Sequence, residues 1–142
     1  MKTKNKLFNS VQEMSLRVLL LLSKNNDAYY SLEKIVSIDF ITCYSADFKI
    51  PYPNLHGINK FKFGEIANRR MLVKNSIKYL TIRGLIEIKI ENGYKFRISQ
   101  LGYTYVNLLE SPYSIKYREI AESAINKYGK DSDENILKLV CF

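Results

Sequence analysis

Apolar side chains crowd the chain shortly after its start. Between Val11 and Ser23 the sequence contains Met14, Leu16 and an unbroken apolar run from Val18 to Leu22. Apolar residues on most sides of a segment this long are typical of a helix that is buried over most of its surface. The pattern therefore predicts a first helix over residues 11–23.

A second apolar pattern follows the break at Asn25-Asn26-Asp27. The positions that share one face at three-to-four spacing are Leu32, Ile35, Val36, Asp39 and Cys43. Ser31 precedes them and suits an N-cap, because its hydroxyl can accept a hydrogen bond from the first turn. We predict a second helix that begins after Ser31 and ends near Tyr44.

Periodicity disappears between Ala46 and Phe63, where Pro51 and Pro53 exclude a regular helix and favour an extended path. Loops of this length without periodic structure are uncommon in compact domains and are often functional. We therefore expect an irregular insertion over residues 46–63.

Helical periodicity returns from Glu65 to Arg83, and Gly84 is placed to cap the C-terminus of this third helix. The stripe expected to face the core consists of Ile66, Arg70, Val73, Ile77 and Leu80. The opposite face carries Asn68, Met71, Leu72, Asn75, Lys78, Tyr79 and Ile82. So many large apolar residues suit a protein interface better than a DNA-reading surface. The alternative is that the later helices fold back over this face.

Strict alternation of apolar and polar residues follows in two runs, 85–91 and 94–99. A two-residue Asn92-Gly93 loop would set Ile90 opposite Lys95 and mix the two faces of the hairpin. A three-residue loop, with Gly93 in the left-handed conformation of a bulge, removes this conflict. The resulting pairs are Ile90 with Tyr94, Ile88 with Phe96 and Ile86 with Ile98.

Three further helices are predicted after the hairpin. Apolar residues from Leu101 to Leu109 indicate a fourth helix ended by Pro112, and those from Tyr117 to Tyr128 a fifth ended by Gly129. A short last helix covers roughly 133–140. Three helices followed by a hairpin are the winged-helix order. The fold predicted is mainly α (α+β): a winged helix-turn-helix with a β-hairpin wing and additional C-terminal helices. We expect one domain over 1–142, with a basic N-terminal tip (1–10) and a C-terminal helical extension (113–142).

Composition agrees with a globular protein, because 46% of the residues are hydrophobic and 25% are charged. The longest apolar run is too short to span a membrane, and no signal cleavage site follows it, so we expect a cytoplasmic protein. Cys43 and Cys141 have neither metal-ligand spacing nor a disulfide framework, and both are expected to be reduced.

The net charge of +8 is unevenly placed. Between Lys60 and Arg97 ten basic residues stand against three acidic ones, whereas acidic residues are in slight excess from Glu110 onward. A local basic excess indicates a polyanion or an acidic protein surface as partner, although it equally promotes solubility. The residues expected to contact nucleic acid, without reading its sequence, are Lys74, Lys78, Lys89, Lys95 and Arg97.

Candidate catalytic chemistry is sparse. His56 is the single histidine, and the spacing places no Cys or His companion beside it, so we expect no metal, no cofactor and no nucleophile pair. Together with Glu65, Arg69 and Arg70 it could resemble an acid/base site with anion-binding arginines. The simpler interpretation is that Glu65 pairs with Arg69 along the helix and that His56 fixes the loop. We expect the four residues to form an architectural polar cluster.

Several short phrases together resemble the middle component of ABC-three-component systems, the Lamassu-type prokaryotic antiviral and antiplasmid defence operons. They are the 16–22 run, Asp39-Phe40-Ile41 with Tyr44 and Asp47, Asn54-Leu55-His56-Gly57, Phe63-Gly64-Glu65, Arg69-Arg70 and Arg83-Gly84-Leu85-Ile86. The resemblance covers roughly 16–109, and its most specific part is the series of His56, Glu65, Arg69 and Arg70. Where many relatives have Ser-Leu-His-Pro, this chain has Asn54-Leu55-His56-Gly57.

The resemblance implies a small non-enzymatic adaptor between an SMC-like ABC ATPase and an effector nuclease, with DNA contacted through the complex and no membrane or small-molecule substrate. The residues expected to bind these partners are His56, Glu65, Arg69, Arg70, Met71, Tyr79 and Ile82. Two other hypotheses stay open: a stand-alone winged-helix transcription regulator, and a small enzyme centred on His56.

Overall fold

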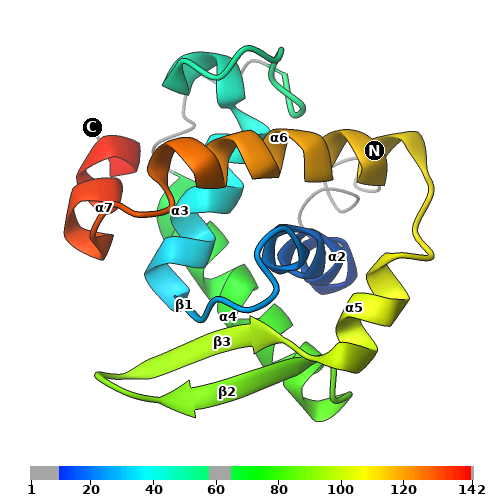
Figure 1. The fold of residues 1–142 in the computed structure, drawn as a ribbon. Coiled ribbons are helices and arrows are strands. Elements are labelled where there is room, and N and C mark those ends of the chain that lie inside the picture. Colours follow the sequence, from blue (N-terminus) through cyan, green and yellow to red (C-terminus); the bar gives the residue numbers. More distant parts are fainter. Residues whose placement is uncertain (1–9, 58–64, 142) are drawn as a thin grey trace.

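The computed structural model describes residues 10–57 and 65–141 and shows a mainly helical chain with one small sheet (Figure 1). The elements are α2 (Val11–Ser23), β1 (Tyr30–Ser31), α3 (Leu32–Cys43), the 3-10 helix η1 (Ser45–Phe48), α4 (Ile66–Ile82), β2 (Ile86–Ile90), β3 (Tyr94–Ile98), α5 (Gln100–Val106), α6 (Pro112–Tyr128) and α7 (Asp133–Cys141). The sheet is antiparallel with the order β1-β3-β2. The predicted α+β class is confirmed.

The first two predicted helices are confirmed to within a residue. Ser10 caps α2 by accepting a hydrogen bond from the Glu13 amide at 3.0 Å, and Ser31 caps α3 through the Lys34 amide at 3.1 Å. Helix α2 lies at the centre of the molecule, with α6 on one side and the sheet on the other (Figure 1). Its apolar run is buried from Val18 to Leu22, as the density of apolar residues predicts.

Helix α4 packs against α2 and α3, and its rotation differs from the prediction. Its buried residues are Ile66, Arg69, Val73, Ser76, Ile77 and Leu80. Arg69 therefore occupies the core position predicted for Arg70, which lies at the edge with 35% of its side chain exposed. The assignment of Arg70 to the core stripe is wrong, because Arg69 has a buried carboxylate to meet and Arg70 does not.

The hairpin has the predicted register. Ile90 faces Tyr94, Ile88 faces Phe96 and Ile86 faces Ile98, and Gly93 has a φ of 97°. The third strand, β1, was not predicted, because two residues are too few to show an alternating pattern. It pairs Tyr30 with Phe96 and Ser31 with Lys95.

Gly93→Ala is expected to lower the free energy of unfolding by about 1 kcal/mol, because a Cβ atom disfavours the positive φ at this position. For a chain of this length that corresponds to a melting temperature roughly 3 °C lower. Asn92→Gly is the matched control: Asn92 also has a positive φ, of 54°, which glycine accepts without strain. An unchanged melting curve for Gly93→Ala would contradict the strain argument.

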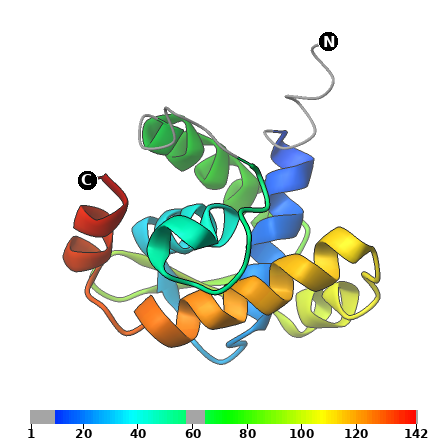
Figure 2. The same cartoon turned by 90° about the horizontal axis from the view of Figure 1, so that it is seen from above.

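The C-terminal helices differ from the prediction at one boundary. Helix α5 ends at Val106, before Leu109, and Pro112 begins α6 instead of ending α5. Proline suits the first turn of a helix because the N–H groups of that turn have no intrahelical acceptor, so the N–H that proline lacks costs no hydrogen bond. Ser111 caps the same turn by accepting a hydrogen bond from the Ser114 amide at 3.1 Å. Seen from above, α3 lies between α4 and α6 (Figure 2).

The predicted insertion is less irregular than expected. It includes all of η1 except Ser45, and its residues Phe48 and Ile50 are buried. Helix α6 fixes this segment, because the Tyr128 hydroxyl donates to the Phe48 carbonyl at 2.7 Å. The rest of the insertion, 58–63, and most of the basic tip, 1–9, lie outside the described residues.

Candidate functional site: the surface of α4 and the charged cluster beneath it

Asp39 on α3 is the centre of a buried network of charged side chains. Arg17 on α2 donates from Nε to Oδ1 at 2.9 Å and from Nη2 to Oδ2 at 3.0 Å. Arg69 on α4 donates to the same Oδ2, and the Tyr117 hydroxyl on α6 donates to Oδ1 at 2.5 Å. One carboxylate thus joins four helices. We call Asp39, Arg17, Arg69 and Tyr117 the Asp39 cluster.

The charges in the cluster compensate one another. Burial alone would raise the pKa of Asp39, but the positive charges of Arg17 and Arg69 outweigh it and hold the pKa below its ordinary value. Glu13 forms a second ion pair with Arg17, at 2.8 Å, and burial raises the pKa of Glu13. Burial and then the charge of Asp39 raise the pKa of Tyr117, so its hydroxyl remains a donor. Both buried guanidinium groups therefore have carboxylate partners.

His56 lies at one border of the cluster. Its Nε2 atom is 2.9 Å from the Tyr113 hydroxyl and 3.6 Å from the Cys43 sulfur. The expectation that no cysteine accompanies His56 is wrong, because the loop after η1 folds back and bonds the His56 amide to the Cys43 carbonyl at 3.3 Å. Sequence spacing alone does not reveal this return.

The contact between Cys43 and His56 does not have the electrostatics of a nucleophile pair. Burial, followed by the charge of Asp39, raises the pKa of the Cys43 thiol to about 11. Burial, followed by the charge of Arg17, lowers the pKa of His56 to about 3. Reactive cysteines instead have a depressed pKa and partial exposure. At neutral pH the pair consists of a protonated thiol and a neutral imidazole.

Thiol titration of the native protein with a disulfide reagent is expected to modify Cys141 rapidly and Cys43 only after unfolding. Cys141 is exposed, whereas Cys43 is fully buried with a raised pKa. The Cys141→Ser variant leaves Cys43 as the only thiol and should be nearly unreactive until denaturant is added. Rapid reaction of native Cys141→Ser would instead favour a reactive thiol beside His56.

The four predicted polar residues fall into two groups. Glu65 accepts a hydrogen bond from the Tyr44 hydroxyl at 2.9 Å, and the Tyr44 ring meets His56 edge-on with the ring centroids 6.4 Å apart. Arg69 contacts the Cys43 sulfur at 3.7 Å and turns its guanidinium to Asp39, not to Glu65 as predicted. Tyr44 and Cys43 therefore connect His56, Glu65 and Arg69.

Arg70 lies outside this group. It forms two hydrogen bonds with Glu33 on α3, at 2.8 and 2.9 Å, on the partly exposed side of α4. The sequence analysis did not select Arg17, Asp39, Tyr113 or Tyr117 as site residues. Two signals were nevertheless present: an arginine inside a leucine-rich helix and an aspartate on an apolar stripe.

The outward face of α4 carries the apolar residues predicted for a partner. Met71 is 59% exposed and Ile82 is 82% exposed, while Leu72 and Tyr79 are half-buried. The alternative in which the later helices cover this face is contradicted for Met71 and Ile82, which stay exposed, whereas Tyr79 lines a hollow together with Tyr105 of α5.

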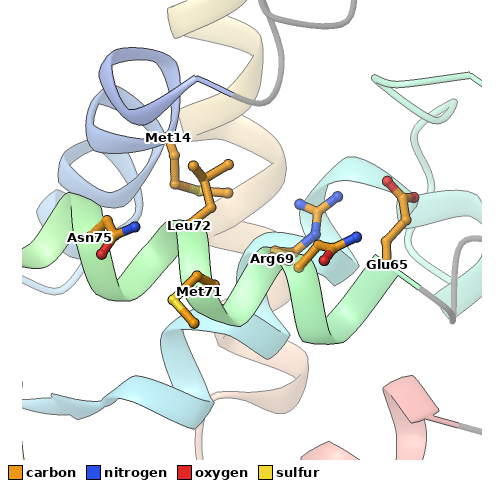
Figure 3. Close-up of a pocket in the computed structure, with 7 residues that line it drawn as sticks. Met14, Glu65, Arg69, Met71, Leu72 and Asn75 are labelled. Carbon is orange, nitrogen blue, oxygen red and sulfur yellow. The ribbon is translucent and has the colours of Figure 1, made fainter.

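Three separate hollows border this face. Met71 lines the first, of about 330 Å³, together with Met14 and Leu72, which face each other across α2 and α4 (Figure 3). Tyr79 lines the second beneath Arg83, whose guanidinium lies 3.5 Å from the centre of the Tyr79 ring. Ile82 lines the third, between α4 and the β2–β3 hairpin. Glu65 and Arg69 reach the edge of the first hollow (Figure 3).

The five predicted nucleic-acid residues lie on two different faces. Lys74 and Lys78 are exposed on α4 beside the third hollow. Lys89, Lys95 and Arg97 alternate onto the outer face of the hairpin.

Acidic residues partly neutralise that outer face. Arg97 pairs with Glu87 at 2.6 Å, and Lys89 pairs with Glu91 at 3.3 Å. The Tyr29 ring also lies beneath Arg97, 4.5 Å from its guanidinium carbon.

Across residues 10–57 and 65–141, no group of three or more His, Cys, Asp or Glu side chains is placed to hold a metal ion. In the same ranges no helix has both the length and the hydropathy needed to cross a membrane.

The comparisons with known proteins give one finding. The family model described as ABC-three component (ABC-3C) system Middle Component 2 matches residues 7–141. No curated protein and no solved structure matches the chain.

Proposed function

The chain belongs to the Middle Component 2 family of ABC-three component systems, and we propose that it is the non-catalytic adaptor of a prokaryotic defence complex. In this proposal it joins an SMC-like ABC ATPase to an effector nuclease, as in Lamassu-type systems. The proposal takes residues 1–142 as one cytoplasmic winged-helix domain, with α2, α3 and α4 as its three helices and the β2–β3 hairpin as its wing.

The observation that carries the proposal is the uncovered apolar surface of α4. Met71 and Ile82 leave more than half of their surface in water, next to hollows lined by further apolar side chains. Exposed large apolar side chains that border apolar hollows are typical of interaction sites on soluble proteins, because covering them removes apolar surface from water. A major-groove reading helix would present Arg, Asn or Gln at such positions.

The Asp39 cluster supports an architectural role for the polar residues. Arg69 forms a buried ion pair with Asp39 and thereby fixes the N-terminal half of α4. His56 and Glu65 hold the loop beside it through Tyr113 and Tyr44. We infer that these three residues fix the shape of the α4 surface that binds a partner. Arg70, which is paired with Glu33, would contact the partner through the exposed part of its guanidinium group.

Co-expression of the chain with the ATPase and effector subunits tests the proposal. After nuclease treatment, size-exclusion chromatography with light scattering should show the three chains in one species of fixed stoichiometry. The chain alone should have no hydrolytic activity. Elution of the chain apart from both subunits would contradict the adaptor role, and a hydrolytic activity lost in His56→Gln would support the enzyme hypothesis.

A second candidate, the stand-alone transcription regulator, rests on the basic outer face of the hairpin. We expect only weak DNA binding there, without sequence preference. If Lys89, Lys95 and Arg97 each contact one phosphate, raising the salt concentration from about 50 mM to about 200 mM would weaken binding roughly 40-fold. Titration of labelled duplexes at the two salt concentrations checks this. Tight binding to one operator sequence would favour the regulator instead.

A further inference from the structure

We propose that the hollow between α4 and the β2–β3 hairpin binds an amphipathic segment of a partner protein. The segment is apolar where it enters the hollow and acidic where it passes Lys74 and Lys78. We call this hollow the α4–hairpin groove. The inference rests on the adaptor function proposed above, and it assigns to one surface a partner of defined chemistry.

The groove is formed by apolar side chains from two directions. Ile77 and Ile82 line it from α4, and Ile88, Tyr94 and Phe96 line it from the inner face of the hairpin. The pairing of Ile88 with Phe96 and of Ile90 with Tyr94 places these side chains on the same face of the sheet. The groove has a volume of about 570 Å³, the largest of the three hollows beside α4.

The apolar lining is open to solvent toward the end of α4 and the tip of the hairpin. Ile82 is 82% exposed and Tyr94 is 64% exposed, whereas Ile77 and Phe96 at the base are buried. A buried base with an exposed apolar rim is the form of a groove that receives side chains from outside. We therefore expect a partner protein to cover the exposed apolar rim of the groove.

Charge identifies the chemistry of that partner. Lys74 and Lys78 are one helical turn apart at the edge of the groove, and both are exposed. Neither takes part in any ion pair among the described residues, whereas Arg70 on the same helix is paired with Glu33. Two unpaired ammonium groups beside an apolar groove favour carboxylates on the incoming segment.

Other occupants fit less well. A nucleic-acid backbone would cover Ile82 and Tyr94 with strongly hydrated phosphates and give them no apolar contact. A second copy docked through the same groove would bring the lysines of both chains together without acidic partners, which is repulsive. An acidic amphipathic segment satisfies both the apolar lining and the lysines.

Site-specific photo-crosslinking in the co-expressed three-component complex tests the inference. A photoreactive phenylalanine analogue replaces Ile82, and the control carries it at Leu108, which is 74% exposed outside the groove. From position 82 we expect a crosslink to a partner peptide that combines apolar and acidic residues. Crosslinking to DNA or to a second copy of the chain, or a yield no higher than from position 108, would overturn the inference.

Substitutions give the second arm. Ile82→Asp and Lys78→Glu should each weaken retention of one partner subunit at least tenfold, while the matched controls Leu108→Asp and Lys130→Glu should not. All four positions are exposed, so melting curves should stay close to that of the wild type.

The two proposals fail in different ways. If the wild-type chain assembles and the groove variants assemble equally well, the groove inference is wrong and the adaptor function stands. If the wild-type chain retains neither partner, both are wrong.

Discussion

Asp39→Ala is expected to lower the free energy of unfolding by about 3–5 kcal/mol, because it leaves the guanidinium groups of Arg17 and Arg69 buried without their shared carboxylate. Asp39→Asn keeps the volume but removes the charge, and it should cost nearly as much. Urea unfolding followed by circular dichroism measures both effects.

Arg70→Ala is the matched control for this experiment. Its ion pair with Glu33 is about one-third exposed on each side, so solvent screening limits its contribution to about 1 kcal/mol or less. Arg69→Ala should instead resemble Asp39→Ala, although the two arginines are neighbours in the sequence. Equal unfolding midpoints for the Arg69 and Arg70 variants would show that Asp39 does not organise the core.

As the pH is lowered, the protein is expected to lose stability at pH values well above those at which ordinary carboxylates titrate. The folded pKa of His56 is lowered to about 3 from an ordinary value of 6.5, so below pH 6.5 the unfolded chain binds a proton that the folded chain does not. The free energy of unfolding therefore falls by about 1.4 kcal/mol per pH unit, or about 2 kcal/mol by pH 5. Asp39 acts lower: its stabilisation is complete above its ordinary pKa of 3.8 and is lost as pH falls below it.

The variant His56→Gln separates these contributions. Among the described residues, the charged groups that act on His56 are Arg17, Arg69 and Asp39, and all three keep their charge between pH 5 and pH 7. The fall in the free energy of unfolding between pH 7 and pH 5 should thus be lost in His56→Gln, since Glu13, whose folded pKa is raised, binds its proton more readily in the folded chain and acts in the opposite direction. Equal pH slopes for the variant and the wild type would mean that His56 is not the group responsible.

Much of the fold is predictable because its signals are local. Ser31 caps the helix that follows it, and the hairpin register follows from the alternation on either side of Gly93. The rotation of α4 is not local. Helical spacing places Arg69 and Arg70 almost equally close to the core stripe. Arg69 is the buried one because the carboxylate of Asp39, on another helix, pairs with it.

The candidate site was predictable in part for the same reason. Spacing along α4 placed Met71 and Ile82 on the outer face, where the structure exposes them. The meeting of His56 with Cys43 depends on the path of a segment without periodicity, which gives no register to count. The division of the α4 surface into three hollows depends on α2, α5 and the hairpin packing around it.

A cryo-electron microscopy structure of the assembled three-component complex tests the central claim most directly. The account predicts that the outward face of α4 is covered by protein, with Met71 and Ile82 buried against a partner subunit and a carboxylate near Lys74 or Lys78. A complex in which this face stays in solvent or lies on DNA, with the partners held elsewhere, would contradict it.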